Sequence, residues 1–148
     1  MPTLEKRLCF GAYRLNRAFN RFYQRAFCET GLTYPKYVIL SALEEQGAMS
    51  VSELSQHAGV EPNSLSPLLK KMSGFGVLSR ERLAEDERRV VIDLTERGRE
   101  LLRQVHDVIA RGFADLGLDE AHAHALLEGF EDMRNRLDQA NPPRLSLE

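Results

Sequence analysis

Apolar side chains recur every third or fourth residue along the first part of the chain, which is the spacing of one face of an α-helix. This apolar seam consists of Leu8, Ala12, Leu15, Phe19, Phe22 and Ala26. A different face of the same segment carries Arg14, Arg17, Arg21 and Arg25. We therefore predict one long helix over residues 4–29, which Gly31 ends.

The middle of the chain shows the start and stop signals of three further helices. Pro35 suits the first turn of a helix that runs to about residue 45, because the N–H group it lacks has no helical partner there. Ser50, with Glu53 three residues later, has the spacing of a capping box for a short helix. A helix over residues 63–73 follows, with an apolar face formed by Leu65, Leu68, Leu69 and Met72.

Two segments after these helices have the pattern of β-strands. Residues 77–82 alternate like a strand, and residues 89–94 are rich in β-branched side chains, so together they predict a hairpin. Thr95 is placed to cap a long helix, and a last helix covers residues 120–137.

This order of elements predicts a mainly α-helical protein with a β-hairpin wing. A short helix joined to a second by a glycine-containing turn, followed by a charged hairpin, is typical of a winged helix-turn-helix, here residues 35–95. Residues 1–34 and 96–148 are then helices with more apolar surface than one small domain needs. We expect this surplus to form a homodimer interface, so that these two segments are the dimerisation region.

Composition and charge narrow the classes of function. The chain has 148 residues, of which 43% are hydrophobic and 28% charged, which fits one folded domain with a helical extension. The net charge is −2, so any contact with nucleic acid must come from local charge. No apolar run reaches the ~18 residues of a membrane span, and the N-terminus lacks the apolar core of a secretory signal. We therefore expect a cytoplasmic protein without membrane contact, with both cysteines reduced.

The helix over residues 63–73 carries the side chains that a DNA recognition helix needs. Such a helix presents small polar groups and cations to the major groove from its N-terminal half. The residues outside its apolar face are Asn63, Ser64, Ser66, Pro67, Lys70 and Lys71. The serines let the backbone approach base edges, the proline offers an apolar surface to a thymine methyl, and the lysines suit phosphates. Ordinary capping and solvent-exposed roles are the alternative.

The predicted hairpin adds positive charge next to this helix. Residues 63–89 hold six cations against four acids, a local charge of +2 in a chain that is negative overall. The hairpin cations are Arg80, Arg82, Arg88 and Arg89. Arg88 is placed to enter a minor groove, and Asp86 to fix the turn and orient Arg88. The alternative is a solvated loop of ion pairs, which contributes little energy.

The segment from Asp86 to Thr95 resembles the wing signature D-x-R-x5-L-T of the MarR family. The similarity extends through the preceding helices and the flanking helices, and so covers nearly the whole chain. This resemblance implies a homodimeric winged-helix transcription regulator that binds palindromic duplex DNA.

Within that family the chain looks like the OhrR branch, the organic-hydroperoxide sensors. The similarity lies in the LCF sequence around Cys9, the TYP sequence around Tyr34 and the PLLKKM sequence of residues 67–72. The resemblance implies that Cys9 is the peroxide-reactive thiol and that Tyr23 and Tyr34 of the other subunit hydrogen-bond it, with Tyr13 beside them. It implies a repressor that organic hydroperoxide inactivates.

Helix geometry is compatible with that arrangement. Cys9, Tyr13 and Tyr23 point within ~40° of one direction on a helix, but Cys9 and Tyr23 are ~21 Å apart along it. A chain therefore cannot bring its own Tyr23 to Cys9, whereas two helices that cross antiparallel near Asn16 can exchange these contacts. Cys9 also lies near the positive helix end, with Lys6 one turn back. The alternative is that Cys9 is a small buried hydrophobic residue.

Cys28 is the second cysteine and departs from that branch. In a continuous helix it lies ~28 Å from Cys9 and points ~140° away from Tyr23, which excludes an intrachain disulfide and favours a structural role. The C-terminal helices hold no cysteine. We therefore predict a one-cysteine sensor whose sulfenic acid is trapped by a small cellular thiol.

Three other functions remain as alternatives. In the first, a small aromatic ligand held by Tyr13, Tyr23, Tyr34 and Tyr37 releases the repressor from DNA. In the second, the protein is a thiol peroxidase, but such an enzyme needs no wing arginines. Metal sensing is disfavoured because His122 and His124 are two residues apart and do not share a helix face. We expect no cofactor and no metal site.

Overall fold

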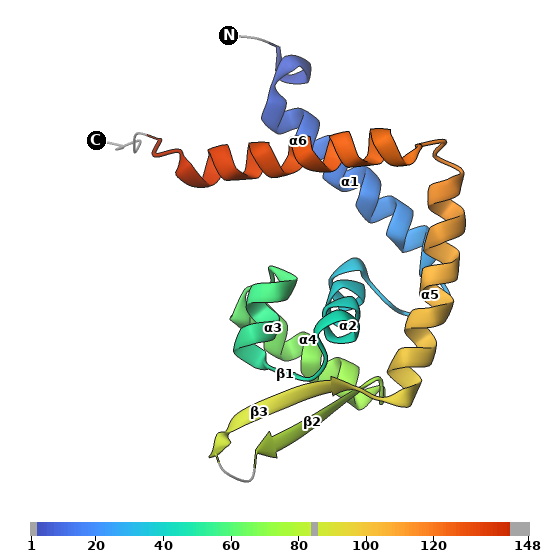
Figure 1. Cartoon of the computed structure of the whole chain (residues 1–148), viewed down its shortest axis with the longest axis vertical. Helices are drawn as coiled ribbons and strands as arrows, with labels where there is room; N and C mark the ends of the chain where they lie inside the picture. Colours follow the sequence, from blue (N-terminus) through green and yellow to red (C-terminus); the bar gives the residue numbers. More distant parts are fainter. Residues whose placement is uncertain (1–2, 84–85, 143–148) are drawn as a thin grey trace. The chain divides into compact units, whose positions relative to one another are not determined.

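The computed structural model describes residues 3–83 and 86–142, and it describes no side chains at residues 82–83 and 86–89. The chain divides into two compact units, one that ends at Ala110 and one that begins at Arg111. The elements are mainly helices with one small antiparallel sheet (Figure 1), which confirms the predicted fold class.

The N-terminal helix is shorter than the predicted range of residues 4–29 at both ends. A 3₁₀ turn, η1 (Leu4–Lys6), comes first, and the extended Arg7 separates it from α1 (Leu8–Ala26). At the other end, both the N–H and the hydroxyl of Thr30 donate to the Phe27 carbonyl oxygen, each at 3.0 Å. These local bonds compete with helical continuation, so the chain turns before Gly31.

The winged region follows the predicted order of elements and adds one strand. Its elements are α2 (Tyr34–Gln46), β1 (Met49–Ser50), α3 (Val51–Ala58), α4 (Pro62–Gly74), β2 (Leu78–Leu83) and β3 (Asp86–Leu94). The sheet order is β1-β3-β2, and Ile92 pairs with both Met49 and Arg80. Strand β1 was not predicted from the sequence, because two residues are too few to show alternation. The returning strand begins at Asp86, three residues before the predicted start at Arg89.

The core of the larger unit lies between these elements. Ile39, Leu40, Leu54, Leu65 and Ile92 are all 0% exposed. The predicted apolar face of α4 is confirmed at three buried positions, Leu65, Leu69 and Met72. The fourth, Leu68, is only half-buried.

Hydrogen-bonded caps begin two helices of the larger unit. The predicted capping box of α3 is present, with the Glu53 N–H donating to Ser50 Oγ and the Ser50 N–H donating to Glu53 Oε2. At the start of α5 (Glu96–Ala114), the Gly98 N–H donates to Thr95 Oγ1 at 3.1 Å, and the Thr95 hydroxyl donates to the Gly76 carbonyl at 2.7 Å. Thr95 therefore caps α5 as predicted and also ties it to the start of the hairpin.

Gly98 allows a close approach at the same joint. A Cβ atom at this position would lie 2.2 Å from the Val77 carbonyl oxygen, which is backbone and cannot rotate away. A glycine is therefore needed where α5 crosses the strand that begins the hairpin.

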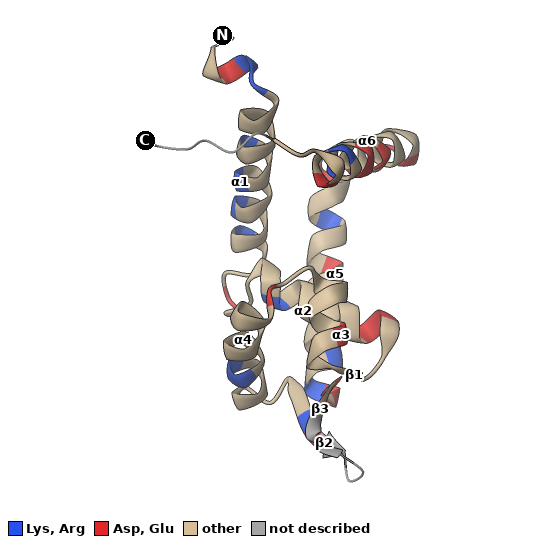
Figure 2. Cartoon of the chain, turned by 90° about the vertical axis from the view of Figure 1, so that its left-hand side faces the viewer, with Lys and Arg blue, Asp and Glu red and all other residues tan. Residues whose placement is uncertain are grey.

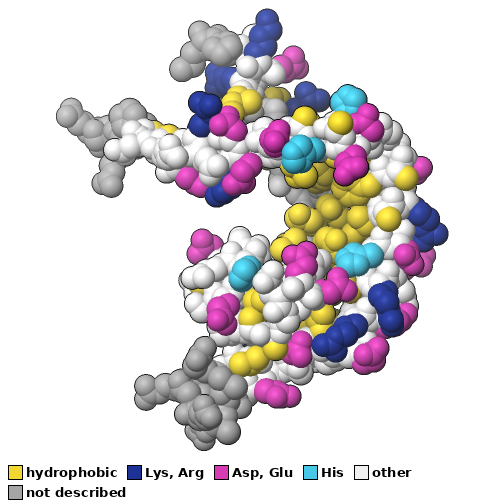
Figure 3. Space-filling model, viewed as in Figure 1, with side chains coloured by type: hydrophobic (Ala, Val, Ile, Leu, Met, Phe, Trp, Pro, Cys, Tyr) yellow, Lys and Arg dark blue, Asp and Glu magenta, His cyan; other side chains and the backbone are white. Residues whose placement is uncertain are grey.

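The smaller unit contains the end of α5 and the helix α6 (Glu120–Gln139). The Asp119 carboxylate accepts a hydrogen bond from the His122 N–H and caps α6. No side chain of α6 is buried, and its exposed apolar side chains include Leu126, Leu127, Phe130 and Leu137. The space-filling view shows hydrophobic side chains at the surface of the molecule (Figure 3). The division into winged and dimerisation regions stays a prediction.

Among the described residues, no helix is both long and apolar enough to cross a membrane.

Candidate functional site

Helix α4 has one buried and one exposed face. Its buried face, Leu65, Leu69 and Met72, holds the helix against the core. All the residues proposed for DNA contact on this helix are exposed, namely Asn63, Ser64, Ser66, Pro67, Lys70 and Lys71. Part of the α4 ribbon has the blue of Lys and Arg in Figure 2. The packing therefore presents the polar face of α4 outward.

The N-terminal half of α4 has an unusual backbone. Pro62 occupies its first turn, and the N–H groups of Ser64 and Leu65 both donate to the Glu61 carbonyl at 2.9 Å. Pro67 lies inside the helix and has no N–H to give to the Asn63 carbonyl. The Asn63 carbonyl therefore lacks the donor that the fourth following residue of a helix usually supplies.

The β2–β3 hairpin carries the predicted wing cations. Arg80 is exposed on β2. The strands pair antiparallel from Leu78 with Leu94 to Arg82 with Val90, and the register shifts after Arg82. The side chains of Arg82, Asp86, Arg88 and Arg89 lie outside the described part of the structure, so their roles stay predictions.

Cys9 is the second residue of α1, and its side chain is exposed. One turn later, Tyr13 is 54% exposed and its ring stacks on Phe10 with centroids 6.2 Å apart. The Arg17 guanidinium lies 5.7 Å from the centre of the Tyr13 ring and donates to the Tyr13 hydroxyl at 3.2 Å. Tyr13 therefore stands near Cys9 in sequence, with its hydroxyl oxygen already hydrogen-bonded to Arg17.

The other predicted tyrosines gather at the opposite end of α1. Tyr23 is 8% exposed, and its ring centroid lies 4.4 Å from Tyr34 and 5.9 Å from Tyr37. Phe27 packs on Tyr23 at 5.5 Å. We call Tyr23, Phe27, Tyr34 and Tyr37 the aromatic cluster. It joins α1 to α2.

Tyr37 and Phe27 are members that the proposed redox site did not include. Tyr34 and Tyr37 are three residues apart on α2. Tyr23 lies on α1, and Phe27, four residues later, is the C-cap of that helix. Helical spacing therefore places each pair on one face, and this spacing could have predicted the cluster from the sequence.

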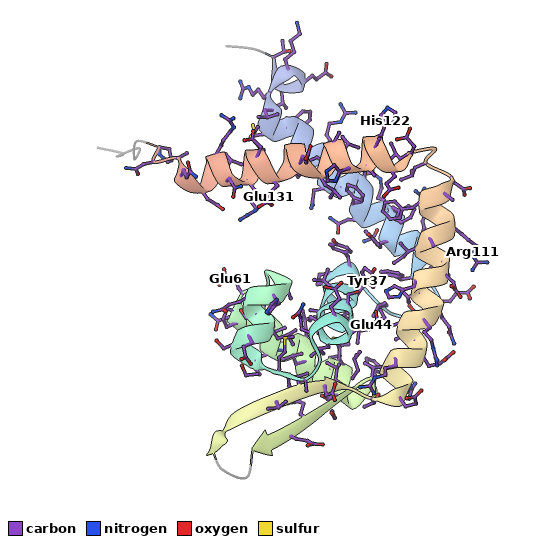
Figure 4. All side chains as sticks on the ribbon, viewed as in Figure 1. Tyr37, Glu44, Glu61, Arg111, His122 and Glu131 are labelled. Carbon is purple, nitrogen blue, oxygen red and sulfur yellow. The ribbon has the colours of Figure 1, made fainter. Side chains whose placement is uncertain are left out.

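The aromatic cluster also reaches α5. The His106 ring meets Tyr37 edge-on with centroids 6.0 Å apart, and His106 Nε2 lies 3.8 Å from Glu44 Oε2. Tyr37 and Glu44 are labelled on α2 in Figure 4. These contacts connect α1, α2 and α5 within the larger unit.

Burial changes the acidity of the central tyrosine. Desolvation raises the pKa of Tyr23 to about 12, and the nearby Tyr34 and Tyr37 hydroxyls add to the effect. The Tyr23 phenol therefore stays protonated at neutral pH and can act as a hydrogen-bond donor.

Comparisons with known proteins agree with this fold. The family described as transcriptional regulator SarA/Rot matches residues 21–105. The HTH-type transcriptional regulator TtmR of Methylorubrum extorquens is 36% identical over 139 residues, which cover 91% of this chain and 69% of TtmR. The chain belongs to the MarR/SarA-type winged-helix transcriptional regulators. These are DNA-binding regulators and not enzymes.

Other relatives of this MarR/SarA-type regulator differ in what their names describe. The organic hydroperoxide resistance transcriptional regulator of Bacillus subtilis is 34% identical over 105 residues, 71% of each chain. The structure of reduced AbfR bound to DNA has a TM-score of 0.77 and 29% identity, and covers 92% of this chain and 95% of AbfR. Disulfide-formed AbfR has a TM-score of 0.69 and 28% identity, with 92% and 93% coverage.

The position of Cys28 in this MarR/SarA-type regulator corrects one inference. Because α1 ends at Ala26, Cys28 lies in the turn that follows and not on the helix. The angle that was used to separate it from Tyr23 therefore has no basis. Both cysteines are free, and Cys28 is exposed, so burial does not account for it.

The histidines of the smaller unit have local acidic partners. His122 Nδ1 lies 2.7 Å from Asp119 Oδ1, and His124 Nε2 lies 3.2 Å from Glu128 Oε1. In the described part of the chain, no three His, Cys, Asp or Glu side chains gather as a metal site would require.

Proposed function

We propose that this protein is a homodimeric repressor that binds palindromic duplex DNA and is inactivated when an organic hydroperoxide oxidises Cys9. The observation that carries the proposal is the placement of an exposed cysteine at one end of α1 and of the buried Tyr23, in contact with Tyr34 and Tyr37, at the other. The similarity to a regulator named for organic hydroperoxide resistance supports the choice of oxidant.

DNA recognition follows from the exposed face of α4. With its N-terminal half in the major groove, Asn63, Ser64 and Ser66 meet base edges, and Pro67 meets a thymine methyl. The cations Lys70, Lys71, Arg80, Arg82, Arg88 and Arg89 contact phosphates or the minor groove, and Asp86 orients Arg88. The two recognition helices of a dimer are then expected to lie ~34 Å apart.

The exposed seam of α1 supports the homodimer. Leu8, Leu15 and Phe19 are 66%, 40% and 36% exposed, on a helix that is otherwise well formed. Two α1 helices that cross antiparallel near Asn16 cover these side chains. The same crossing brings each Cys9 to the aromatic cluster of the other subunit, since Cys9 and Tyr23 of one chain are ~21 Å apart.

The chemistry is a two-electron oxidation of the thiolate. Sγ of Cys9 attacks the terminal oxygen of the hydroperoxide, an S–O bond forms and the O–O bond breaks. The alkoxide takes up a proton and leaves as an alcohol, so the peroxide is reduced and Cys9 becomes a sulfenic acid. A small cellular thiol then condenses with the sulfenic acid, which forms a mixed disulfide and releases water. Tyrosine hydroxyls donate to the sulfur before the reaction.

The aromatic cluster supplies a route from Cys9 to the winged region. It packs α1 against α2, and α2 contacts α3, which in turn contacts α4. A bulky mixed disulfide next to these rings requires them to move. We therefore expect oxidation to shift the α4 helices of the dimer and weaken DNA binding.

The gathering of Tyr23, Tyr34 and Tyr37 also supports a second candidate, release by a small aromatic ligand. Their ring centroids are 4.4–6.2 Å apart, so the rings already contact one another. A ligand would have to separate them, which makes this candidate the weaker one. The two candidates differ in whether the response needs Cys9.

The test is a DNA-binding titration with and without cumene hydroperoxide, with a small thiol present. A labelled duplex, selected by the protein from a random pool, reports binding by fluorescence anisotropy. We expect oxidation to weaken wild-type binding by about tenfold or more, within the usual range of coupling between two sites. Cys9→Ser should bind DNA and ignore the peroxide.

Cys28→Ser is the matched control, because it removes the other exposed thiol and should respond like the wild type. Mass spectrometry of the oxidised protein should find the small thiol on Cys9. Unchanged DNA binding by protein oxidised at Cys9 would contradict the mechanism. A dominant Cys9–Cys28 linkage would contradict the one-cysteine scheme, and sedimentation of a monomer would contradict the dimer.

The DNA interface has its own test. Lys70→Ala should weaken binding about equally for all sequences and lower the slope of log affinity against log salt by about 1. Asn63→Ala should weaken binding mainly to the selected sequence. An equal effect of both substitutions on random DNA would contradict the assignment of α4 as the reading helix.

A further inference from the structure

The side of α1 that carries Cys9 continues with a tyrosine and an arginine. Cys9, Tyr13 and Arg17 follow one another at intervals of four residues, so they lie along one side of the helix. Side chains on a helix lean toward its N-terminus, so Arg17 extends toward Tyr13 and Tyr13 toward Cys9. Cβ atoms at this spacing are about 5–6 Å apart. Rotation about the side-chain bonds of Cys9 and Tyr13 can therefore bring the Tyr13 hydroxyl to Cys9 Sγ.

Arg17 and Tyr13 are already in contact. Arg17 Nη1 donates to the Tyr13 hydroxyl oxygen at 3.2 Å, and the guanidinium lies 5.7 Å from the centre of the Tyr13 ring. Because a guanidinium has no acceptor, the Tyr13 hydroxyl accepts in this bond, and its own proton is left for another partner. A phenol that accepts a charge-assisted hydrogen bond is also a stronger donor, since hydrogen bonds in a chain polarise one another.

The surroundings of Arg17 are electropositive. Residues 6–28 contain six Lys and Arg side chains and no Asp or Glu. In the part of the chain that the structure describes, no carboxylate forms an ion pair with Arg17. A carboxylate therefore does not compete with Tyr13 for this guanidinium.

We propose that Arg17 is a positioning residue for Cys9, which holds the Tyr13 hydroxyl oxygen so that the Tyr13 proton is donated to Cys9 Sγ. The inference rests on the proposed role of Cys9 as the reacting thiol. A thiolate accepts the Tyr13 proton as a hydrogen bond, whereas a neutral thiol would have to donate to the Tyr13 oxygen, where Arg17 already donates. Arg17 therefore favours the thiolate, which is the form that attacks a peroxide.

Arg14 offers a matched control on the same helix. Its guanidinium lies 6.0 Å from the centre of the Phe10 ring, a contact like that of Arg17 with Tyr13, but Phe10 has no hydroxyl. Arg14→Gln and Arg17→Gln thus remove the same charge and the same kind of ring contact. Of the two, Arg17→Gln alone removes a hydrogen bond to a phenol.

The test measures the rate at which Cys9 is alkylated by monobromobimane, in the Cys28→Ser protein, where Cys9 is the remaining cysteine. At neutral pH, Arg17→Gln should lower this rate by about three- to tenfold, the range that one net hydrogen bond predicts. Arg17→Lys should recover part of the loss, because it keeps the charge. Arg14→Gln should stay within about twofold of the parent protein, since exposed charges interact weakly. At about pH 10 an ordinary thiol is ionised, so the rates should converge.

Tyr13→Phe shows whether the effect of Arg17 passes through the phenol. It should lower the rate at neutral pH by a similar factor, and adding Arg17→Gln should then cause no further loss. Both residues are exposed, so neither substitution opens the core. The proposal is overturned if Arg17→Gln slows alkylation no more than Arg14→Gln, if its loss persists at about pH 10, or if the two losses multiply in the double variant.

Alkylation needs no peroxide, so this test is separate from that of the proposed function. A Cys9 whose alkylation depends on Arg17 but which cumene hydroperoxide does not oxidise would contradict the proposed function and support the role of Arg17. A Cys9 that is oxidised at the same rate in the wild type and in Arg17→Gln would overturn the role of Arg17 and leave the proposed function intact.

Discussion

The residues from α2 to β3 and the residues of α1 both place apolar side chains on faces that can pack, yet they bury these side chains to very different extents. Ile39, Leu54 and Ile92 in the first region are 0% exposed, whereas Leu8 and Leu15 in α1 are 66% and 40% exposed. Within α1 only Tyr23 is buried. Apolar periodicity thus identifies the helix face that is expected to pack against other residues. It does not say whether those residues belong to the same chain.

The difference has a simple physical origin. The helices α2, α3 and α4 and the sheet are joined by short turns, so each can close over the others and exclude water from a shared core. Helix α1 meets α2 only near its C-terminal end, where the aromatic cluster forms. Leu8, Leu15 and Phe19 of its seam are exposed in the single chain, which is the basis for the proposed dimer.

The largest expected change in the free energy of unfolding comes from shortening an apolar side chain in each of the two regions. Leu65→Ala empties a 0% exposed position and should lower the free energy of unfolding by about 2–5 kcal/mol at any protein concentration. Leu15→Ala makes the same change on the exposed seam, and its effect should grow as protein concentration falls, because it acts on association. Urea unfolding at two concentrations measures both. Equal, concentration-independent losses would contradict the contrast.

Glycine substitutions give the next effect, with opposite signs at the joint between α5 and the hairpin and on α1. Gly98→Ala should destabilise the protein by about 1–3 kcal/mol, because the new Cβ would lie 2.2 Å from the Val77 carbonyl oxygen. Gly11→Ala on α1 meets nothing within 4 Å and should stabilise the helix by up to about 1 kcal/mol. Thermal unfolding monitored by circular dichroism reports both changes. A stabilising Gly98→Ala would contradict the close approach of Gly98 to the Val77 carbonyl oxygen.

Substitutions at two helix N-caps should differ by a smaller amount in their effect on stability. Ser50→Ala removes a complete capping box and should cost about 1 kcal/mol. Thr33→Ala is the matched control, since Thr33 occupies the N-cap of α2 without a side-chain capping bond and should change little. Denaturant midpoints of the two variants should differ, and a larger loss for Thr33→Ala would contradict the assigned caps.

The smallest effect concerns pH. The pKa of Tyr23 is about 12 in the folded protein against 10.0 for an unperturbed tyrosine, so the folded state holds this proton more tightly than the unfolded state. The resulting stabilisation is present below pH 10 and is lost as the pH rises from 10 to 12. Tyr23→Phe should flatten this part of the stability curve, and the tyrosinate absorbance should lose its highest-pH component. An unchanged absorbance titration would contradict the buried position of Tyr23.

Much of the fold was predictable because its signals are local. The ranges of α2, α3 and α4, the capping box of Ser50 and the Thr95 cap follow from residues within a few positions of each other. Apolar periodicity alone did not predict the breaks at Arg7 and Phe27 or the strand β1. Phe27 ends α1 through bonds from Thr30, and β1 exists only because Met49 pairs with Ile92.

The candidate site also has features that the sequence predicts and features that depend on the tertiary structure. The exposed face of α4 follows from its apolar periodicity, and the structure presents all six proposed residues outward. The inclusion of Tyr37 beside Tyr23 depends on how α1 crosses α2. The exposure of Cys28 depends on where α1 ends.

By itself, the sequence determined the order of the helices and strands, the faces that need cover and the wing signature that resembles the MarR family, because each of these depends on neighbours along the chain. Only the tertiary structure decided that Lys36 is buried, that Gly98 touches the Val77 carbonyl and that three tyrosines meet. These features depend on distances between residues far apart in sequence, and such distances are set by the packing of whole elements.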